Sequence, residues 1–203
     1  MSLSPSSPAQ STRPILIGYQ RRWLADQARL KILTKSRRIG GSFVVALEGA
    51  AAASGLTWHN DGSVKYDPKA GVDQNIVSAS HSQAMDLLEE SGKHLDALEH
   101  VVGHKLVASV SRTRIVLTNG HRLVALSANP RTIRGARGDL ILDEFGVMPR
   151  SLEIWQAAKS IIDPTLGRAQ GYRLRVVGTP CGDGNLFYEF SETEAGAEFS
   201  RHR

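Results

Sequence analysis

The stretch LKILTKSRRIGGSFVVALEGAAAA, residues 30–53, decides how the chain can fold. Residues 30–34 form a short β-prone run, and residues 42–53 are strongly helix-forming and rich in alanine. A polar turn with two adjacent glycines joins the two segments. A strand, a glycine turn and a helix in this order are typical of a loop that binds phosphate groups.

Within this stretch, KSRRIGGS (residues 35–42) departs from the usual phosphate-binding loop. The usual pattern is GxxxxGK[ST], in which backbone N–H groups surround the phosphates, the lysine reaches the outer ones and the hydroxyl holds magnesium. Gly40 and Ser42 stand at their expected places, but Gly41 replaces the lysine and Lys35 stands at the first position. Because so short a loop brings its ends together, Lys35 can still reach the phosphates. The alternative is an ordinary turn before a helix that Ser42 caps.

A second motif, DLILDEF at residues 139–145, supports the nucleotide interpretation. Its apolar run predicts a buried strand that ends in Asp143 and Glu144. Asp143 is the expected ligand of the magnesium shell, and Glu144 is the residue expected to polarise the attacking water. Two solvated acids at a strand end are the alternative, but the order of the two motifs and the length of chain between them favour a nucleotide site.

Two shorter features fit the same scheme. Tyr19 and Gln20 precede the loop, where the glutamine amide can read adenine while the tyrosine ring stacks. The segment VVGTPCGDGN, residues 176–185, follows a predicted strand, and its Thr179 can sense the γ-phosphate and couple its loss to domain movement. The alternatives are an ordinary helix start and a common Gly-Pro loop.

The remaining chain predicts strands that alternate with helices, which indicates an α/β fold with a mainly parallel central sheet. Asn119-Gly120 is a strong hairpin signal between two β-prone runs. The other expected elements are a helix within residues 15–30, an excursion or hairpin at 55–71, a strand at 75–80, a helix at 82–98, strands at 114–117 and 122–126, a helix at 151–162 and a strand at 172–177.

Composition limits the class of protein. The chain has 203 residues, a hydrophobic content of 41% and a net charge of +5, which is compatible with a polyanionic partner. Residues 1–14 are rich in Ser and Pro and are expected to form a disordered tail, with a single domain over residues 15–203. No apolar stretch is long enough to span a membrane, and the single cysteine, Cys181, excludes an internal disulfide. His94, His100 and His104 have helical spacing and are expected on a solvated face rather than in a metal site.

The motifs YQRRWLAD, KSRRIGGS, NPRTIRGARGDLILDEF and VVGTPCGDGNLFYEF, in this order, resemble the ATPase domain of phage terminase large subunits over residues 15–190. The resemblance implies a P-loop NTPase-like fold of the ASCE/RecA-like type, a three-layer sandwich. It also implies a lysine at the start of the loop, so that Lys35 matches a known variant of the motif.

The resemblance assigns roles to individual residues. Glu144, Lys35 and Arg134 match catalytic positions, and Ser42 and Asp143 match ligands of Mg²⁺. Arg134 would act on the nucleotide of a neighbouring subunit, and Arg137 competes for that role. The implied ATP-binding residues are Tyr19, Gln20, Lys35, Ser36, Arg37, Arg38, Ile39, Gly40, Gly41, Ser42 and Thr179.

The implied function is Mg²⁺-dependent ATP hydrolysis that drives viral double-stranded DNA into a procapsid, without nuclease activity from this chain. The implied partners are DNA, the portal protein, the terminase small subunit and further copies in a ring, in the host cytoplasm and not at a membrane. Two alternatives stay open. One is a DNA-binding or assembly module that has lost hydrolysis, which Gly41 favours. The other is a helicase-like DNA-dependent ATPase.

Overall fold

The computed structural model describes residues 16–36, 39–59, 61, 63–162 and 171–203. Its strands are β1 (Leu30–Thr34), β2 (Leu56–Trp58), β3 (Val64–Tyr66), β4 (Gln74–Val77), β5 (Val107–Ser111), β6 (Arg114–Leu117), β7 (Arg122–Leu126), β8 (Asp139–Leu142), β9 (Leu174–Gly178) and β10 (Ser200–His202). Its α-helices are α1 (Gly18–Ala25), α2 (Gly41–Ser54), α3 (His81–Val102), α4 (Pro130–Arg134), α5 (Ser151–Ile162) and α6 (Leu186–Glu192). Short 3₁₀ turns are η1 (Pro68–Ala70), η2 (Phe145–Val147) and η4 (Glu194–Gly196).

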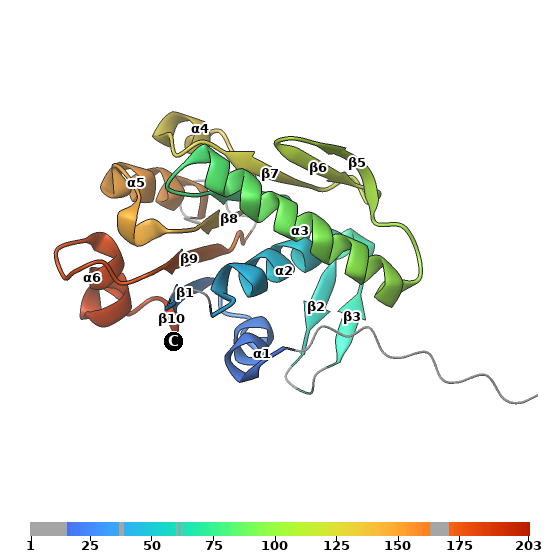
Figure 1. Ribbon diagram of the computed structural model, residues 1–203, viewed down its shortest axis with the longest axis horizontal. Coiled ribbons are helices and arrows are strands. Elements are labelled where there is room, and N and C mark those ends of the chain that lie inside the picture. Colours follow the sequence, from blue (N-terminus) through green and yellow to red (C-terminus); the bar gives the residue numbers. More distant parts are fainter. Residues whose placement is uncertain (1–15, 37–38, 60, 62, 163–170) are drawn as a thin grey trace, which may run out of the picture.

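An eight-stranded sheet with the order β10-β1-β9-β8-β4-β7-β6-β5 forms the central layer (Figure 1). The pairs from β10 to β7 are parallel, and β6 and β5 add antiparallel strands at one edge. In β4 and β8 every residue is buried, as expected of parallel strands covered on both faces. The sequence-based prediction of a mainly parallel sheet is confirmed.

Helices cover both faces of this sheet and complete the three-layer sandwich. Alternate residues of one strand enter different cores: Leu33 packs with α1, α2 and α3, whereas its neighbour Ile32 packs with α4, α5 and α6. The same alternation separates Ile141 from Leu142 in β8. Figure 1 shows α2 and α3 side by side across the sheet face nearer the viewer.

A buried ion network ties α2 to the sheet. Glu48 of α2 accepts from Lys31 of β1 at 2.9 Å and from Arg175 of β9 at 2.8 Å. Burial lowers the pKa of Lys31 to about 8, although the Glu48 carboxylate opposes this change. Glu48 thus connects α2 directly to β1 and β9, and removal of one partner would leave an uncompensated buried charge.

The structure corrects several expected boundaries. The first helix is shorter than residues 15–30, because Asp26 has extended backbone and β1 begins soon after it. Within the expected excursion at 55–71, β2 and β3 pair in antiparallel fashion, and Asn119-Gly120 lies between β6 and β7 as expected. The short helix α4 was not expected from the sequence; Pro130 occupies its first turn and Asn129 caps it. The sequence did not lead us to expect β5, β10 or α6.

A substitution at Gly138, which directly precedes β8, tests the described fold. Its φ of 106° lies in the region that favours glycine, and a Cβ there would stand 2.2 Å from the backbone oxygen of Asp73. Gly138→Ala is therefore expected to lower the free energy of unfolding by about 2–4 kcal/mol in urea titrations. Gly184→Ala is the matched control, since a Cβ at Gly184 meets nothing within 4 Å. Equal unfolding midpoints for the two variants would contradict the described packing.

Candidate nucleotide-binding site

Lys35 leaves the carboxyl end of β1 and enters a cluster of oxygen atoms. Its backbone N–H donates to the Gly178 carbonyl at 2.9 Å, which continues the β1–β9 pairing by one residue. Its ammonium lies 2.9 Å from Ser42 Oγ, 3.0 Å from Asp143 Oδ1 and 3.1 Å from Glu144 Oε1. The two sequence motifs therefore meet at one side chain.

The two glycines of the loop are each required for a different steric reason. Gly40 has a φ of 84°, and a Cβ there would stand 2.8 Å from the Gln20 amide nitrogen. A Cβ on Gly41 would stand 2.8 Å from Cδ of Lys35. The stem of Lys35 thus crosses the position where the usual motif carries its lysine, which explains why Gly41 replaces that lysine.

The acidic pair occupies the turn after β8. The Asp143 N–H donates to the Val77 carbonyl at 2.8 Å and so extends the ladder with β4. Glu144 has a φ of 54°, a strained conformation for a residue with a side chain, and such strain is concentrated at functional sites. The side chain of Asp143 is 9% exposed and that of Glu144 is 27% exposed. Glu144 is therefore the more exposed acid of the pair.

The electrostatics of the cluster keep Lys35 charged. Burial lowers the pKa of Lys35, but Asp143 and then Glu144 outweigh burial, so that its pKa lies above the ordinary value. Burial raises the pKa of Asp143, and the Lys35 ammonium opposes that rise. The Lys35 ammonium thus provides the counter-charge for the buried carboxyl group of Asp143.

A pocket of about 480 Å³ opens beside this cluster. The residues that line it are Lys35, Ser36, Ile39, Gly40, Gly41, Ser42, Phe43, Glu144 and Thr179. The structure therefore brings together most of the site residues expected from the sequence, including Thr179 directly after β9. Arg37 and Arg38 lie outside the described residues.

Tyr19 and Gln20 contact the backbone of the loop and do not line this pocket as the structure describes it. The Tyr19 hydroxyl donates to the Ile39 carbonyl at 2.7 Å, and the Gln20 amide donates to the Gly40 carbonyl at 3.3 Å. Gln20 is buried, and its Oε1 accepts from the Ile17 N–H. In this structure both residues support the shape of the loop.

Phe43 is a pocket residue that sequence reasoning missed. Its ring meets that of His94 edge to face at 4.5 Å, and His94 Nε2 is 3.0 Å from the Phe43 carbonyl. The expectation that His94 lies on a solvated face is wrong: it is 5% exposed because it falls on the buried stripe of α3. The helical spacing of His94 from Ser91, Leu95 and Leu98 could have indicated that it lies on the buried face of α3.

The candidate arginines stand apart from the pocket. Arg134 ends α4 and Arg137 follows it, and both side chains are exposed. Neither lines the pocket among the described residues.

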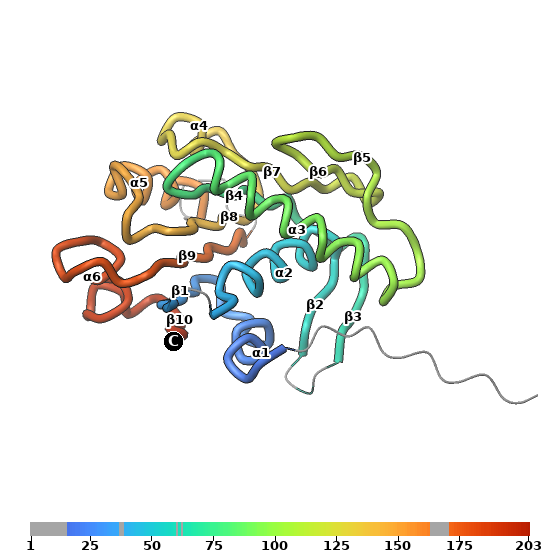
Figure 2. The backbone as a smooth tube through the Cα atoms, in the orientation of Figure 1, coloured from blue at the N-terminus to red at the C-terminus, as the bar shows by residue number. Residues whose placement is uncertain are grey.

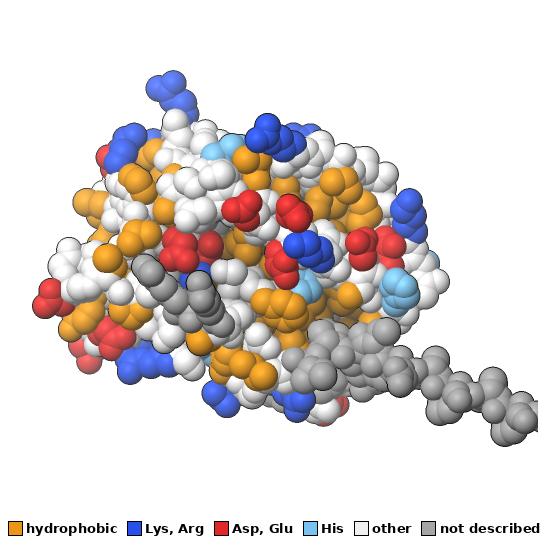
Figure 3. Space-filling model, in the orientation of Figure 1, with side chains coloured by type: hydrophobic (Ala, Val, Ile, Leu, Met, Phe, Trp, Pro, Cys, Tyr) orange, Lys and Arg blue, Asp and Glu red, His pale blue; other side chains and the backbone are white. Residues whose placement is uncertain are grey.

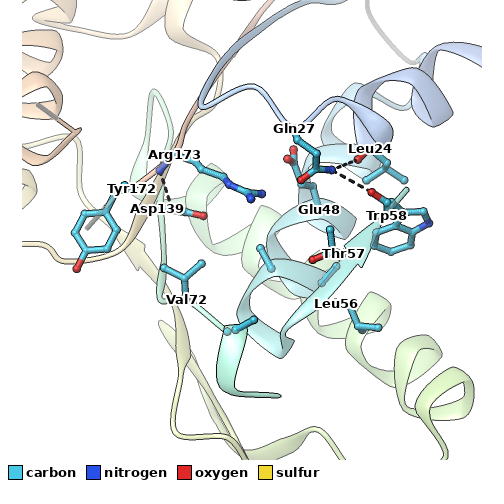
Figure 4. Close-up of a pocket in the computed structure, with 15 residues that line it drawn as sticks. Leu24, Gln27, Glu48, Leu56, Thr57, Trp58, Val72, Asp139, Tyr172 and Arg173 are labelled. Atoms are coloured by element: carbon cyan, nitrogen blue, oxygen red, sulfur yellow. Dashed lines mark hydrogen bonds between the residues drawn. The ribbon is translucent and has the colours of Figure 1, made fainter. Parts of the chain in front are cut away.

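A second pocket of about 320 Å³ lies at the amino ends of β8 and β9 (Figure 4). Its wall includes Asp139, the first residue of β8, whose carboxylate accepts from the Arg173 N–H at 2.8 Å, together with Glu48 and Trp58. Ligands of parallel α/β sheets bind at the carboxyl ends of the strands. The pocket beside Lys35 is therefore the candidate site, and the pocket in Figure 4 is not.

The oxygen atoms at the site fit a divalent cation such as Mg²⁺. Ser42 Oγ and Asp143 Oδ1 both lie within 3.0 Å of one ammonium nitrogen, so they converge on a single cationic position. Mg²⁺ takes hard oxygen ligands, commonly one or two from protein with the rest from phosphates and water. No group of three or more His, Cys, Asp or Glu side chains suited to a metal occurs among the described residues.

A parallel sheet whose first strand leads through a glycine loop into a helix, with an Asp-Glu pair at the end of a nearby strand, defines the P-loop nucleoside triphosphatase class. Residues 32–195 match the family described as terminase large subunit, T4-like virus type, N-terminal. The chain belongs to this family.

Similar proteins and structures agree with this assignment. The chain is 27% identical over 184 residues to the Mu-like prophage FluMu protein gp28 of Haemophilus influenzae, and 24% identical over 208 residues to the probable terminase large subunit gp28 of Escherichia phage Mu. These matches cover 90% and 94% of this chain but 34% of each relative. The chain thus spans about a third of their length.

Two solved structures share the fold. The large terminase ATPase domain of Thermus phage P74-26 matches with a TM-score of 0.62 and 21% identity, covering 86% of this chain and 68% of that one. The large terminase of bacteriophage HK97 matches with a TM-score of 0.59 and 16% identity, covering 86% of this chain and 35% of that one. The predicted three-layer fold is confirmed.

Lys35→Ala tests the electrostatics of the cluster in the absence of ligand. The change leaves Asp143 buried without its counter-charge, so we expect the free energy of unfolding at pH 7 to fall by about 2–4 kcal/mol. Lys93→Ala is the matched control: Lys93 also pairs with two glutamates but is exposed, so stability should stay nearly unchanged.

The loss in Lys35→Ala should depend on pH. Without Lys35, the pKa of Asp143 in the folded protein rises further above its ordinary value of 3.8. The folded variant then binds more protons than the unfolded chain, so its stability falls as the pH rises above that value. Urea unfolding at several pH values should show the smallest deficit in acid. A deficit that is constant with pH would contradict the described ion cluster.

Proposed function

We propose that this chain is the ATP-hydrolysing motor domain of a phage terminase large subunit, which drives double-stranded DNA into a procapsid. The observation that carries the proposal is the convergence of Lys35 with Ser42, Asp143 and Glu144 beside a pocket of about 480 Å³. Family membership supports the same conclusion.

In the proposed reaction, Lys35 exchanges its carboxylate partners for the outer phosphates of ATP. Its long side chain already crosses Gly41 toward the pocket. Ser42 and Asp143 would hold Mg²⁺, which offsets charge on the outer phosphates when it is bound. Glu144, released from Lys35, accepts a hydrogen bond from the water that attacks the γ-phosphate in line.

Thr179 would couple the chemistry to movement. It follows β9 directly, lines the pocket and stands beside the turn that carries Glu144. A hydroxyl at this place can bind the γ-phosphate and lose that contact after hydrolysis. Gln20, whose amide now holds the loop backbone, would read adenine only after an exchange of hydrogen bonds.

The charge on the surface favours one region for DNA. Asp86, Glu89 and Asp96 of α3 are exposed and disfavour a polyanion beside this helix. Figure 3 shows acidic side chains on the face where α3 lies. Arg131, together with Arg134 and Arg137 after it, is exposed around α4 and favours one. In an assembled ring these arginines also have the opportunity to contact a neighbouring nucleotide.

The further partners in this proposal come from the family: the portal protein, the terminase small subunit and other copies of the chain, in the host cytoplasm at the procapsid portal. No helix in the described part of the chain is long and apolar enough to cross a membrane.

Steady-state ATP hydrolysis with Mg²⁺ tests the chemistry. Glu144→Gln is expected to bind a fluorescent ATP analogue but to hydrolyse ATP at least about 100-fold more slowly. Lys35→Ala is expected to lose both binding and hydrolysis, and Glu89→Gln, an exposed glutamate on α3, should behave like the parent. A parent protein that neither binds nor hydrolyses ATP at any concentration would reject the proposal. It would favour the DNA-binding or assembly module.

Mixing two inactive variants tests whether Arg134 acts between subunits. Arg134→Ala keeps Glu144, and Glu144→Gln keeps Arg134, so a mixture can form sites with both groups intact. We expect each variant alone to lose about 10³-fold in rate and the mixture to recover part of the activity. Arg137→Ala should lose less. Full activity of Arg134→Ala alone would show that this arginine has no catalytic role.

A further inference from the structure

Ser78 presents a polar group with no visible use. Its side chain is 0% exposed, and its hydroxyl has no hydrogen-bond partner. Only Trp23 Nε1 and Glu48 Oε2 share this condition among the described side chains. A buried unpaired hydroxyl costs free energy that alanine would avoid, and such a group calls for an explanation.

The sheet register places Ser78 beside Asp143. Val77 pairs with Leu142 in the parallel β4–β8 ladder, and the Asp143 N–H donates to the Val77 carbonyl. The residues that follow, Ser78 and Asp143, are therefore neighbours at the carboxyl edge of the sheet. Figure 2 shows β4 and β8 side by side at this place.

Side-chain alternation puts both residues on the same face. Ile76 and Ile141 belong to the core beneath α2 and α3, whereas Val77 and Leu142 belong to the opposite core. Ser78 and Asp143 come next and return to the face of Ile76 and Ile141. Lys35 and α2 lie on that face too. The unpaired Ser78 hydroxyl is therefore on the same side of the sheet as Lys35 and Asp143.

The neighbouring serines have structural roles that Ser78 lacks. Ser80 caps α3, because its Oγ accepts from the Gln83 N–H at 3.3 Å, and it also contacts Ser82 at 3.0 Å. Ser91, equally buried within α3, donates to the Leu87 carbonyl at 3.0 Å. The absence of a partner is therefore specific to Ser78 among these serines.

We infer that Ser78 is a positioning residue for Asp143. In the structure Lys35 binds Asp143, and the Ser78 hydroxyl is unpaired. When Lys35 moves to the phosphates, as the proposed function requires, Asp143 loses that donor. Rotation about χ1 then lets the Ser78 hydroxyl donate to the Asp143 carboxylate and fix its orientation toward the cation.

The test compares Ser78→Ala with Ser91→Ala, an equally buried serine that does not line the pocket. The first measurement is urea unfolding without metal or nucleotide, where Ser78→Ala should be as stable as the parent or more stable. The second is the affinity for a fluorescent, non-hydrolysable ATP analogue, measured with Mg²⁺ and again with EDTA. Ser78→Ala should bind about 10-fold more weakly with Mg²⁺ and equally well with EDTA. Ser91→Ala should match the parent in the ratio of these two affinities.

The outcomes separate this inference from the proposed function. Equal Mg²⁺-dependent affinity in Ser78→Ala and the parent would overturn the role of Ser78 and leave the ATPase proposal in place. The same loss with Mg²⁺ and with EDTA would also overturn it, because it would indicate a general change of shape. A parent protein without Mg²⁺-dependent nucleotide binding would overturn both.

Discussion

The ammonium of Lys35 is the interaction on which the site depends. It joins the end of β1 to the end of β8 across the intervening strand β9, and this requires the carboxyl ends of the strands to lie close together. Thr34 at the end of β1 pairs with Gly178, and Leu142 at the end of β8 pairs with Val176, two residues earlier in β9. Gly41 is glycine because the lysine stem crosses it. The ammonium that the usual motif supplies at position 41 is therefore supplied by Lys35 from the start of the loop.

The same cluster stores the charges that nucleotide binding would rearrange. Asp143 and Glu144 share one counter-charge, so removal of Lys35 to a phosphate leaves both acids in need of new partners. A cation held by Ser42 and Asp143 would replace the first contact, and a water molecule would replace the second at Glu144. Ser78 stands where a further donor to Asp143 is needed. The two ion pairs of Lys35 thus link the loop to the acidic turn.

Much of this arrangement could be predicted because short stretches of the sequence determine it. The strand-turn-helix of residues 30–53, the Asp-Glu pair after an apolar strand and the Asn119-Gly120 hairpin are all local signals. Other parts arise only from tertiary contacts. Strand β10 is a short polar segment that pairs with β1 through its backbone, and the unpaired state of Ser78 depends on its neighbours. Phe43 and His94 needed the packing of α2 on α3 before their contact was visible.

The ion network of Lys31, Glu48 and Arg175 has a mechanical consequence. It fastens α2 to β1 and β9 near the middle of the helix, so that the helix and the two strands resist relative displacement. In the proposed reaction, movement after the loss of the γ-phosphate would then fall on the chain beyond β9, between Thr179 and α6. A charge network far from the chemistry would in this way decide which part of the molecule moves.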